Sequence, residues 1–146
     1  MSRIVTISGM DKLNATLKAL EKSAGRHSKS ALIAGGLLVE GEAKRSIMEI
    51  SSGTTVTRYR NGGGSYSHVA ASKGSAPNND TGTLVRGINT EVTEEGVFVG
   101  TTVPHGFFLE FSHPWLIPAL SKKSDDIIKL QIDAVNKSIA ENEHVI

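Results

Sequence analysis

The aromatic side chains of this 146-residue chain are concentrated in one short stretch, HGFFLEFSHPWLIPAL, at residues 105–120. Four of its seven aromatic residues lie there: Phe107, Phe108, Phe111 and Trp115. Large apolar side chains supply most of the energy of a core, so the fold must bury this stretch or present it to a partner. The spacing of the phenylalanines fits one face of a short helix, and the prolines at positions 114 and 118 end that helix.

Apolar residues at helical spacing predict helices at both ends of the chain. A short strand is expected in residues 3–9, followed by a helix that Asp11 caps and a second helix from about residue 28, with a break near Gly25. The apolar side of the second helix is expected to comprise Leu32, Ile33, Leu37, Leu38 and Ile47. Gly35, Gly36 and Gly41 each cost roughly 1 kcal/mol within a helix, so another backbone must pack closely there or the helix must bend.

The segment that begins at Pro118 has the most regular helical pattern and predicts a long C-terminal helix. Its apolar residues are Ile127, Ile128, Leu130, Ile132, Val135 and Ile139. Residues 84–99 predict a β-hairpin, with a turn at residues 94–96 between alternating valines and isoleucine.

Residues 58–82 show no apolar period and are rich in Gly, Ser and Asn, which predicts a long loop. Loops of this length usually serve a function outside their own core. Because helices and strands are segregated along the chain, the predicted fold class is α+β. We expect one domain over residues 1–146: a small antiparallel sheet with a β-hairpin, packed by two N-terminal helices and a long C-terminal helix, with the long glycine-rich loop.

Charge is unevenly distributed, although the net charge is only +1. Residues 51–90 carry four basic side chains against Asp80 alone, whereas residues 91–111 carry four acids and no Lys or Arg. This distribution favours complementary faces that meet within one fold or between copies. The alternative is that solvated loops differ in charge by chance.

No residue pattern points to catalysis or to a metal. The chain has no cysteine, and its five histidines never recur at the spacing of metal ligands. Ser65, Ser67 and His68 lie in the glycine-rich loop, which lacks the rigid scaffold that a nucleophile and its base require. We therefore expect no enzyme, no metal and no cofactor. The sequence also lacks an apolar run that would suit a membrane span or a signal peptide, so no membrane partner is expected.

The glycine-rich loop also interleaves basic and aromatic side chains, as single-strand-binding proteins do. These residues are Arg58, Tyr59, Arg60, Tyr66, His68 and Lys73. The near-neutral net charge weighs against this function, because nucleic-acid binding depends on an excess of positive charge. Nucleic-acid binding through residues 58–73 is the alternative function.

The aromatic stretch has two interpretations. Phe108, Phe111 and Trp115 are expected in the core, the usual place for aromatic residues beside a hairpin and a long helix. One small sheet cannot cover all the apolar faces, so part of the stretch, with Phe107 and Trp115 as candidates, is expected to form a partner surface. Glu110 is expected to anchor a backbone or an arginine, or else to be solvated.

Several pieces of the sequence follow one another in a particular order. They are ISGMDKLNATLKAL at residues 7–20, RYRNGGGSYSHVAASKGSAPNNDTGTL at 58–84, VFVG at 97–100, LEF at 109–111 and PWLIPAL at 114–120. In this order they resemble the head–tail joining or tail-completion (neck) proteins of long-tailed bacteriophages, to which the minor tail protein Z type is related. The positions that match the family's motifs are Asp80, Thr81, Gly82, Leu84, Phe111, Pro114 and Pro118. Ser112 and His113 replace a Gly-Thr pair of the family, and Thr83 replaces a frequent basic residue.

The resemblance implies a structural virion protein of the phage neck or tail top, made in the host cytoplasm. It would assemble with copies of itself into a ring, hexameric in the family, that completes the tail or joins head to tail. Further implied partners are head-closure, tail-terminator, tape-measure or tube proteins, with non-specific contact to passing DNA. The interface residues expected on this basis are Arg58, Tyr59, Arg60, Tyr66, His68, Glu110, Phe107 and Trp115. The loop of one copy is expected to pack on the hairpin and the helical turn of the next.

Overall fold

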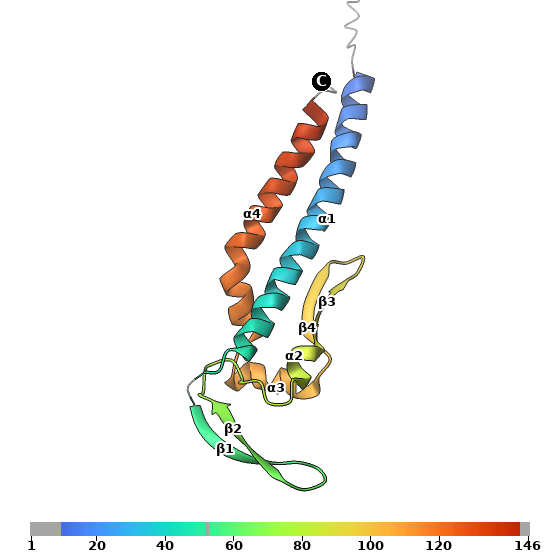
Figure 1. The fold of residues 1–146 in the computed structure, drawn as a ribbon. Helices are drawn as coiled ribbons and strands as arrows, with labels where there is room; N and C mark the ends of the chain where they lie inside the picture. The colour runs from blue at the N-terminus through green and yellow to red at the C-terminus, as the bar shows by residue number, and fades with distance from the viewer. Residues whose placement is uncertain (1–9, 52, 144–146) are drawn as a thin grey trace, which may run out of the picture.

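Two long helices dominate the structure, a computed structural model that describes residues 10–51 and 53–143. Helix α1 (Met10–Met48) and helix α4 (Leu116–Asn142) lie side by side as an elongated antiparallel pair (Figure 1). The short elements gather near the end of this pair that holds Met48. The strand predicted in residues 3–9 lies outside the described residues.

Helix α1 is a single helix, so the prediction of two N-terminal helices with a break near Gly25 is wrong. Neighbouring side chains, and not another backbone, approach closely at Gly35 and Gly36, whereas a Cβ at Gly41 would meet nothing within 4 Å. A Cβ at Gly35 would lie 3.2 Å from Cγ1 of Ile127 in α4, and one at Gly36 would lie 2.7 Å from Cγ1 of Val97. Close packing, rather than a bend, is therefore the reason for this glycine pair.

Within residues 10–51 and 53–143, the sheet content consists of two separate antiparallel hairpins. Strands β1 (Gly53–Tyr59) and β2 (Ser65–Ala71) form the first, in register from Gly53 opposite Ala71 to Tyr59 opposite Ser65. We call β1, β2 and their connecting turn, residues 53–71, the arm, because they project from the body of the molecule (Figure 1). The prediction of one loop over residues 58–82 is wrong for β2, because a strand whose residues are mostly half-buried shows no apolar alternation.

The second hairpin pairs β3 (Ile88–Val92) with β4 (Val97–Thr101) and lies against α1. Its turn at residues 94–96 is confirmed by a hydrogen bond from the Thr93 N–H to the Gly96 carbonyl. The predicted strand begins too early, because Leu84 and Val85 belong to the short helix α2 (Thr83–Gly87). The predicted α+β class is confirmed, with mixed helix and small antiparallel sheets.

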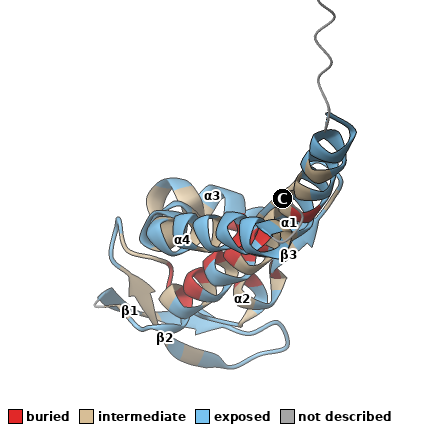
Figure 2. Cartoon of the chain, turned by 90° about the horizontal axis from the view of Figure 1, so that it is seen from above, coloured by how far each residue is buried: buried red, intermediate tan, exposed pale blue. Residues whose placement is uncertain are grey.

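The core lies where α1 meets α2, β3 and the first turn of α4. Its buried residues are Val39, Ala43, Ile47, Leu84, Ile88, Trp115 and Ala119. Figure 2 shows that buried residues gather along α1. Of the predicted apolar side of this helix, Ile47 is buried, whereas Leu32, Leu37 and Leu38 are exposed. Smaller residues of α1 take the buried positions instead, because only small side chains allow α1 and α4 to approach each other so closely.

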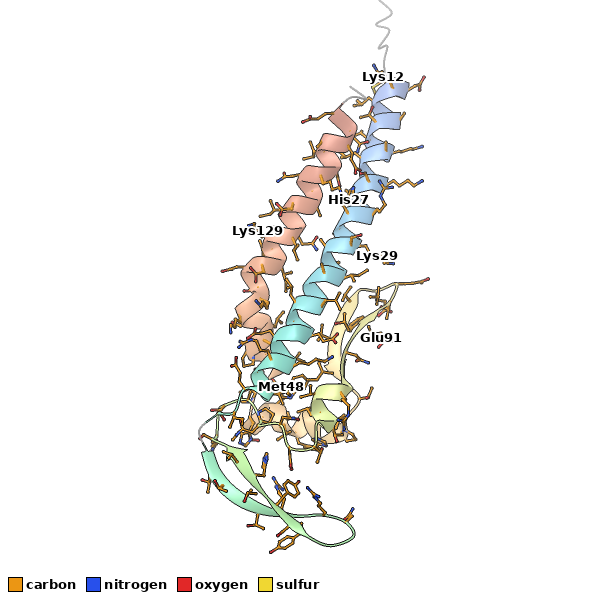
Figure 3. All side chains as sticks on the ribbon, in the orientation of Figure 1. Lys12, His27, Lys29, Met48, Glu91 and Lys129 are labelled. Carbon is orange, nitrogen blue, oxygen red and sulfur yellow. The ribbon has the colours of Figure 1, made fainter. Side chains whose placement is uncertain are left out.

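Further from the core, the α1–α4 pair is joined by polar contacts. Ser28 Oγ donates to Gln131 Oε1 at 2.9 Å, and Ser23 Oγ donates to Glu141 Oε2 at 2.8 Å. His27, labelled in Figure 3, places Nε2 2.8 Å from the same carboxylate. The hydrogen bonds from His27 and Ser23 lower the pKa of Glu141. Large apolar side chains of α4 are left outside this seam, among them Ile128, Ile132, Val135 and Ile139.

Candidate functional site

Helix α3 (Pro104–Ser112) carries an exposed aromatic face. Proline suits the first position of a helix, because the N–H that it lacks would have no partner within the helix there. Its inward side includes Gly106, where a Cβ would lie 2.6 Å from Cγ2 of Thr101, and the half-buried Leu109, which packs against the core. Its outward side is formed by Phe107, Phe108 and Phe111, whose exposed fractions are 65%, 69% and 76%. We call these three residues the phenylalanine face.

The rings of the phenylalanine face contact one another edge to face, with Phe107 5.6 Å from Phe108 and 5.2 Å from Phe111 between centroids. The prediction that one helical face holds all three is confirmed, but the prediction that Phe108 and Phe111 are core is wrong. The physical reason is the side of α3 that carries Gly106 and Leu109: Gly106 fits closely against Thr101 and Leu84, and Leu109 packs against the core.

Trp115 belongs to the core, as one of its two interpretations predicts. Its side chain is 2% exposed, and its indole N–H donates to the Gly106 carbonyl at 3.1 Å. A side chain so buried offers no ring surface to a partner, so its assignment to the interface is wrong in this structure.

Glu110 binds backbone N–H groups of its own chain. Anchoring a backbone was one of the three roles expected for it. Oε2 accepts the N–H groups of Trp115 and Leu116, and Oε1 accepts that of Ile117, each at 2.9 Å. These N–H groups belong to the start of α4, where a helix leaves its donors without internal partners. Glu110 therefore caps α4 from the end of α3 and is not free to bind another molecule.

Asp80 gathers several of the predicted interface residues on one face of the arm. The Tyr66 hydroxyl donates to its Oδ1 at 2.7 Å, Arg58 Nε lies 3.8 Å from Oδ2, and His68 Nδ1 lies 3.8 Å from Oδ1. The hydrogen bond to Asp80 raises the pKa of Tyr66. Arg60 lies over the Tyr66 ring, 5.4 Å from its centroid. The sequence placed Asp80 only in a turn motif, so its role as the partner of these groups was missed.

Tyr59 lies on the opposite face of the arm and is 82% exposed. Successive residues of a strand point to opposite faces, so Tyr59 cannot share the Asp80 side with Arg58. The turn that follows Arg60 contains Gly62, Gly63 and Gly64, all with positive φ, which only glycine adopts readily. The glycine run is thus a hairpin turn and not a phosphate-binding loop.

The base of the arm is held by Asn78, which sequence reasoning missed. Its Oδ1 accepts the Ser51 N–H at 2.8 Å, and its Nδ2 donates to the Val69 carbonyl at 2.8 Å. His113 adds a second link, with Nε2 3.3 Å from the Ala71 carbonyl. The only signal in the sequence was the turn-forming PNND, which predicts a turn but no partner. These contacts fix where the arm leaves the body.

A cavity of about 440 Å³ lies between the arm base and α3, lined by Asp80, His68, His105, His113 and Leu84 among others. Among the described residues, no three His, Asp or Glu side chains are grouped so that they could hold a metal ion. None of the helices in residues 10–51 and 53–143 combines the length and hydrophobicity that a membrane span requires.

The motif residues after Asp80 have structural positions. Thr81 Oγ1 is 2.7 Å from Thr83 Oγ1, Gly82 precedes α2 with φ +77°, and Leu84 is core. Pro114 is half-buried before α4, and Pro118 is exposed in its first turn.

Comparison of the chain with protein-family models, curated proteins and solved structures found no match. The resemblance to phage neck proteins therefore stays a prediction from the sequence motifs.

Proposed function

We propose that this protein is a structural subunit of a phage neck or tail top that assembles with copies of itself into a ring. The observation that carries the proposal is the phenylalanine face. A phenylalanine that becomes fully covered buries about 150–250 Å². With about two thirds of each side chain exposed, Phe107, Phe108 and Phe111 offer roughly 300–500 Å² of apolar surface. A contiguous apolar patch of this size is comparable to the largest on a typical monomer, and such patches are often functional.

The arm gives the proposal a second support. An isolated two-stranded hairpin is at best marginally stable in water, and three or more strands or a packed face are normally needed. Nearly every residue of β1 is exposed, and the arm is tied to the rest of the chain through contacts at its base and through Asp80. Such an element suits a subunit that completes its packing against neighbours in an assembly. The proposed role needs no cofactor and no catalytic group.

Self-assembly is tested by mass photometry and negative-stain microscopy of the purified chain over a range of concentrations. We expect ring-shaped particles that dissociate in the double variant Phe107→Ser/Phe111→Ser. Leu17→Ser, which removes an exposed apolar side chain near the other end of α1, is the matched control and should leave the rings intact. A wild-type chain that stays monomeric at every concentration would contradict the proposal.

The neck assignment needs a separate test, because many proteins form rings. Co-expression with the products of adjacent genes should recover the ring bound to a head-closure, tail-terminator or tail-tube protein. A ring that binds none of these products would argue against a neck role while leaving self-assembly in place.

Nucleic-acid binding is the second candidate, and the exposed Tyr59 beside Arg60 is the observation that favours it. Against it, Tyr66 and Arg58 are already engaged by Asp80, which removes one aromatic and one cation from the binding surface. Fluorescence anisotropy with single-stranded DNA at two salt concentrations separates the candidates. Affinity that falls steeply with salt and is lost in Tyr59→Ser would favour nucleic-acid binding.

A further inference from the structure

We propose that the arm of one copy docks on the outer face of the β3/β4 hairpin of the next copy. In this contact Arg60, which lies on the same face of the arm as Tyr66, pairs with Glu91 beside Phe98. The inference rests on the proposed self-assembly and names the surfaces that meet. It joins the copies head to tail, so a chain of such contacts closes into a ring when the rotation between copies allows it.

The outer face of β3/β4 has the right chemistry to receive the arm. Glu91 and Phe98 are directly opposite each other in the register, so they share one face of the hairpin. Both are exposed, while Val97, on the other face, lies against Gly36 of α1. An aromatic side chain therefore lies beside a carboxylate on the side that points away from the body.

Charge complementarity selects this surface. The arm contains Arg58 and Arg60 and no acid. Arg58 is paired with Asp80, whereas Arg60 has no carboxylate partner among the described residues. On the β3/β4 hairpin, the carboxylates of Glu91, Glu94 and Glu95 form no ion pair with any described residue.

The phenylalanine face is a poorer match for the arm's cation, although it is more apolar. Its nearest acid in the sequence, Glu110, already accepts three backbone N–H groups at the start of α4. A cation docked there would meet no free carboxylate. The phenylalanine face and the β3/β4 face are therefore separate contacts of the assembly.

The arm does not fill this surface in its own chain. Figure 1 shows the arm at the end of the helix pair and β3/β4 alongside α1, and Figure 3 labels Glu91 on that hairpin away from the arm. The unpaired charges of the two hairpins thus remain available to different copies. Each copy would place its arm on one neighbour and bind the arm of another neighbour, and a contact of this kind can build a ring.

Charge reversal tests the contact because the two partners come from different copies. Arg60→Glu and Glu91→Arg should each weaken assembly about tenfold or more, since facing like charges cost several kcal/mol. The double variant Arg60→Glu/Glu91→Arg should assemble again. An equimolar mixture of the two single variants should also assemble, because each arm then meets an opposite charge on the other variant.

Lys73→Glu, which makes the same charge change outside the arm, is the matched control and should leave assembly unchanged. Circular dichroism and thermal melts of all variants check that these exposed substitutions do not unfold the chain. If wild type assembles and both single variants assemble equally well, the proposed contact is wrong while self-assembly stands. A monomeric wild type would instead remove the proposed function, and the contact with it.

Cysteine cross-linking gives an independent measurement, since the chain contains no cysteine. The double variant Tyr66→Cys/Phe98→Cys places one thiol on each side of the proposed contact, since Arg60 lies over the Tyr66 ring and Phe98 is opposite Glu91. Oxidation should give a ladder of covalent multimers, whereas each single variant should give dimers at most. Assembled double variant that yields no ladder would overturn the contact.

Discussion

Replacing Glu110 with alanine should destabilise the protein by about 2–3 kcal/mol, because one carboxylate caps the whole of α4. Glu110→Ala removes the acceptor of three N–H groups, those of Trp115, Leu116 and Ile117, each 2.9 Å from a carboxylate oxygen. Loss of an ordinary helix cap costs about 0.5–2 kcal/mol. Hydrogen bonds to a charged acceptor are roughly twice as strong as neutral ones, which places this substitution at or above the upper end.

The effect should reach the core, because the capped turn contains Trp115 and leads into Ala119. Glu110→Gln keeps a side-chain oxygen but loses the charge, so its cost should be intermediate. Glu94→Ala is the matched control: it removes an exposed carboxylate that forms no ion pair with a described residue, and it should change stability by less than about 0.5 kcal/mol.

Urea denaturation followed by circular dichroism measures these differences, at one protein concentration because assembly makes stability depend on concentration. In thermal melts, the expected loss corresponds to a fall in Tm of about 5–10 °C for a chain of this size. A Glu110→Ala variant that unfolds within about 0.5 kcal/mol of wild type would refute the reasoning. It would mean that solvent caps α4 as well as the carboxylate does.

Two further predictions concern α1. Gly36→Ala should destabilise the protein by about 1–3 kcal/mol, because the new Cβ would lie 2.7 Å from Cγ1 of the stiff Val97 side chain. Gly25→Ala should stabilise the protein by up to about 1 kcal/mol, since nothing lies within 4 Å of the new Cβ. Urea denaturation of the two variants checks both signs. Hydrogen bonds from Arg45 and Lys122 lower the pKa of Glu42 from 4.5 to about 2. Its stabilising contribution is therefore full above about pH 4.5 and lost as the pH falls toward 2, and Glu42→Gln should flatten the measured stability profile across that window; an unchanged slope would contradict the assignment.

The elements that the sequence predicted well are those in which apolar residues recur regularly without interruption. The C-terminal helix and the β3/β4 turn are both present, although the helix begins at Leu116 and not at Pro118. The prediction of a break near Gly25 was wrong, because the packing of a long helix outweighs the free energy that one glycine costs within it. Strand β2 was missed because its residues, half exposed, carry no apolar alternation to detect.

The candidate site was predicted less well than the elements, for a different reason. Arg58, Tyr66 and His68 were recognised as a group, but their common partner Asp80 lies 14 residues beyond Tyr66. Such a contact depends on how the arm folds back toward the segment before α2. Charge and aromaticity indicated which residues face the outside, and only the fold showed that Asp80 already holds part of the set.

The amino-acid sequence alone determined that α3 has one aromatic face, because spacing along a helix sets which side chains point the same way. It also predicted the long C-terminal helix α4, although it divided α1 into two helices. Only the tertiary structure decided which side of α3 is covered. The side that carries Gly106 fits against Thr101 and Leu84, so the three phenylalanines point outward while Trp115 fills the core. Periodicity describes one helix, whereas burial depends on the shape of what packs against it.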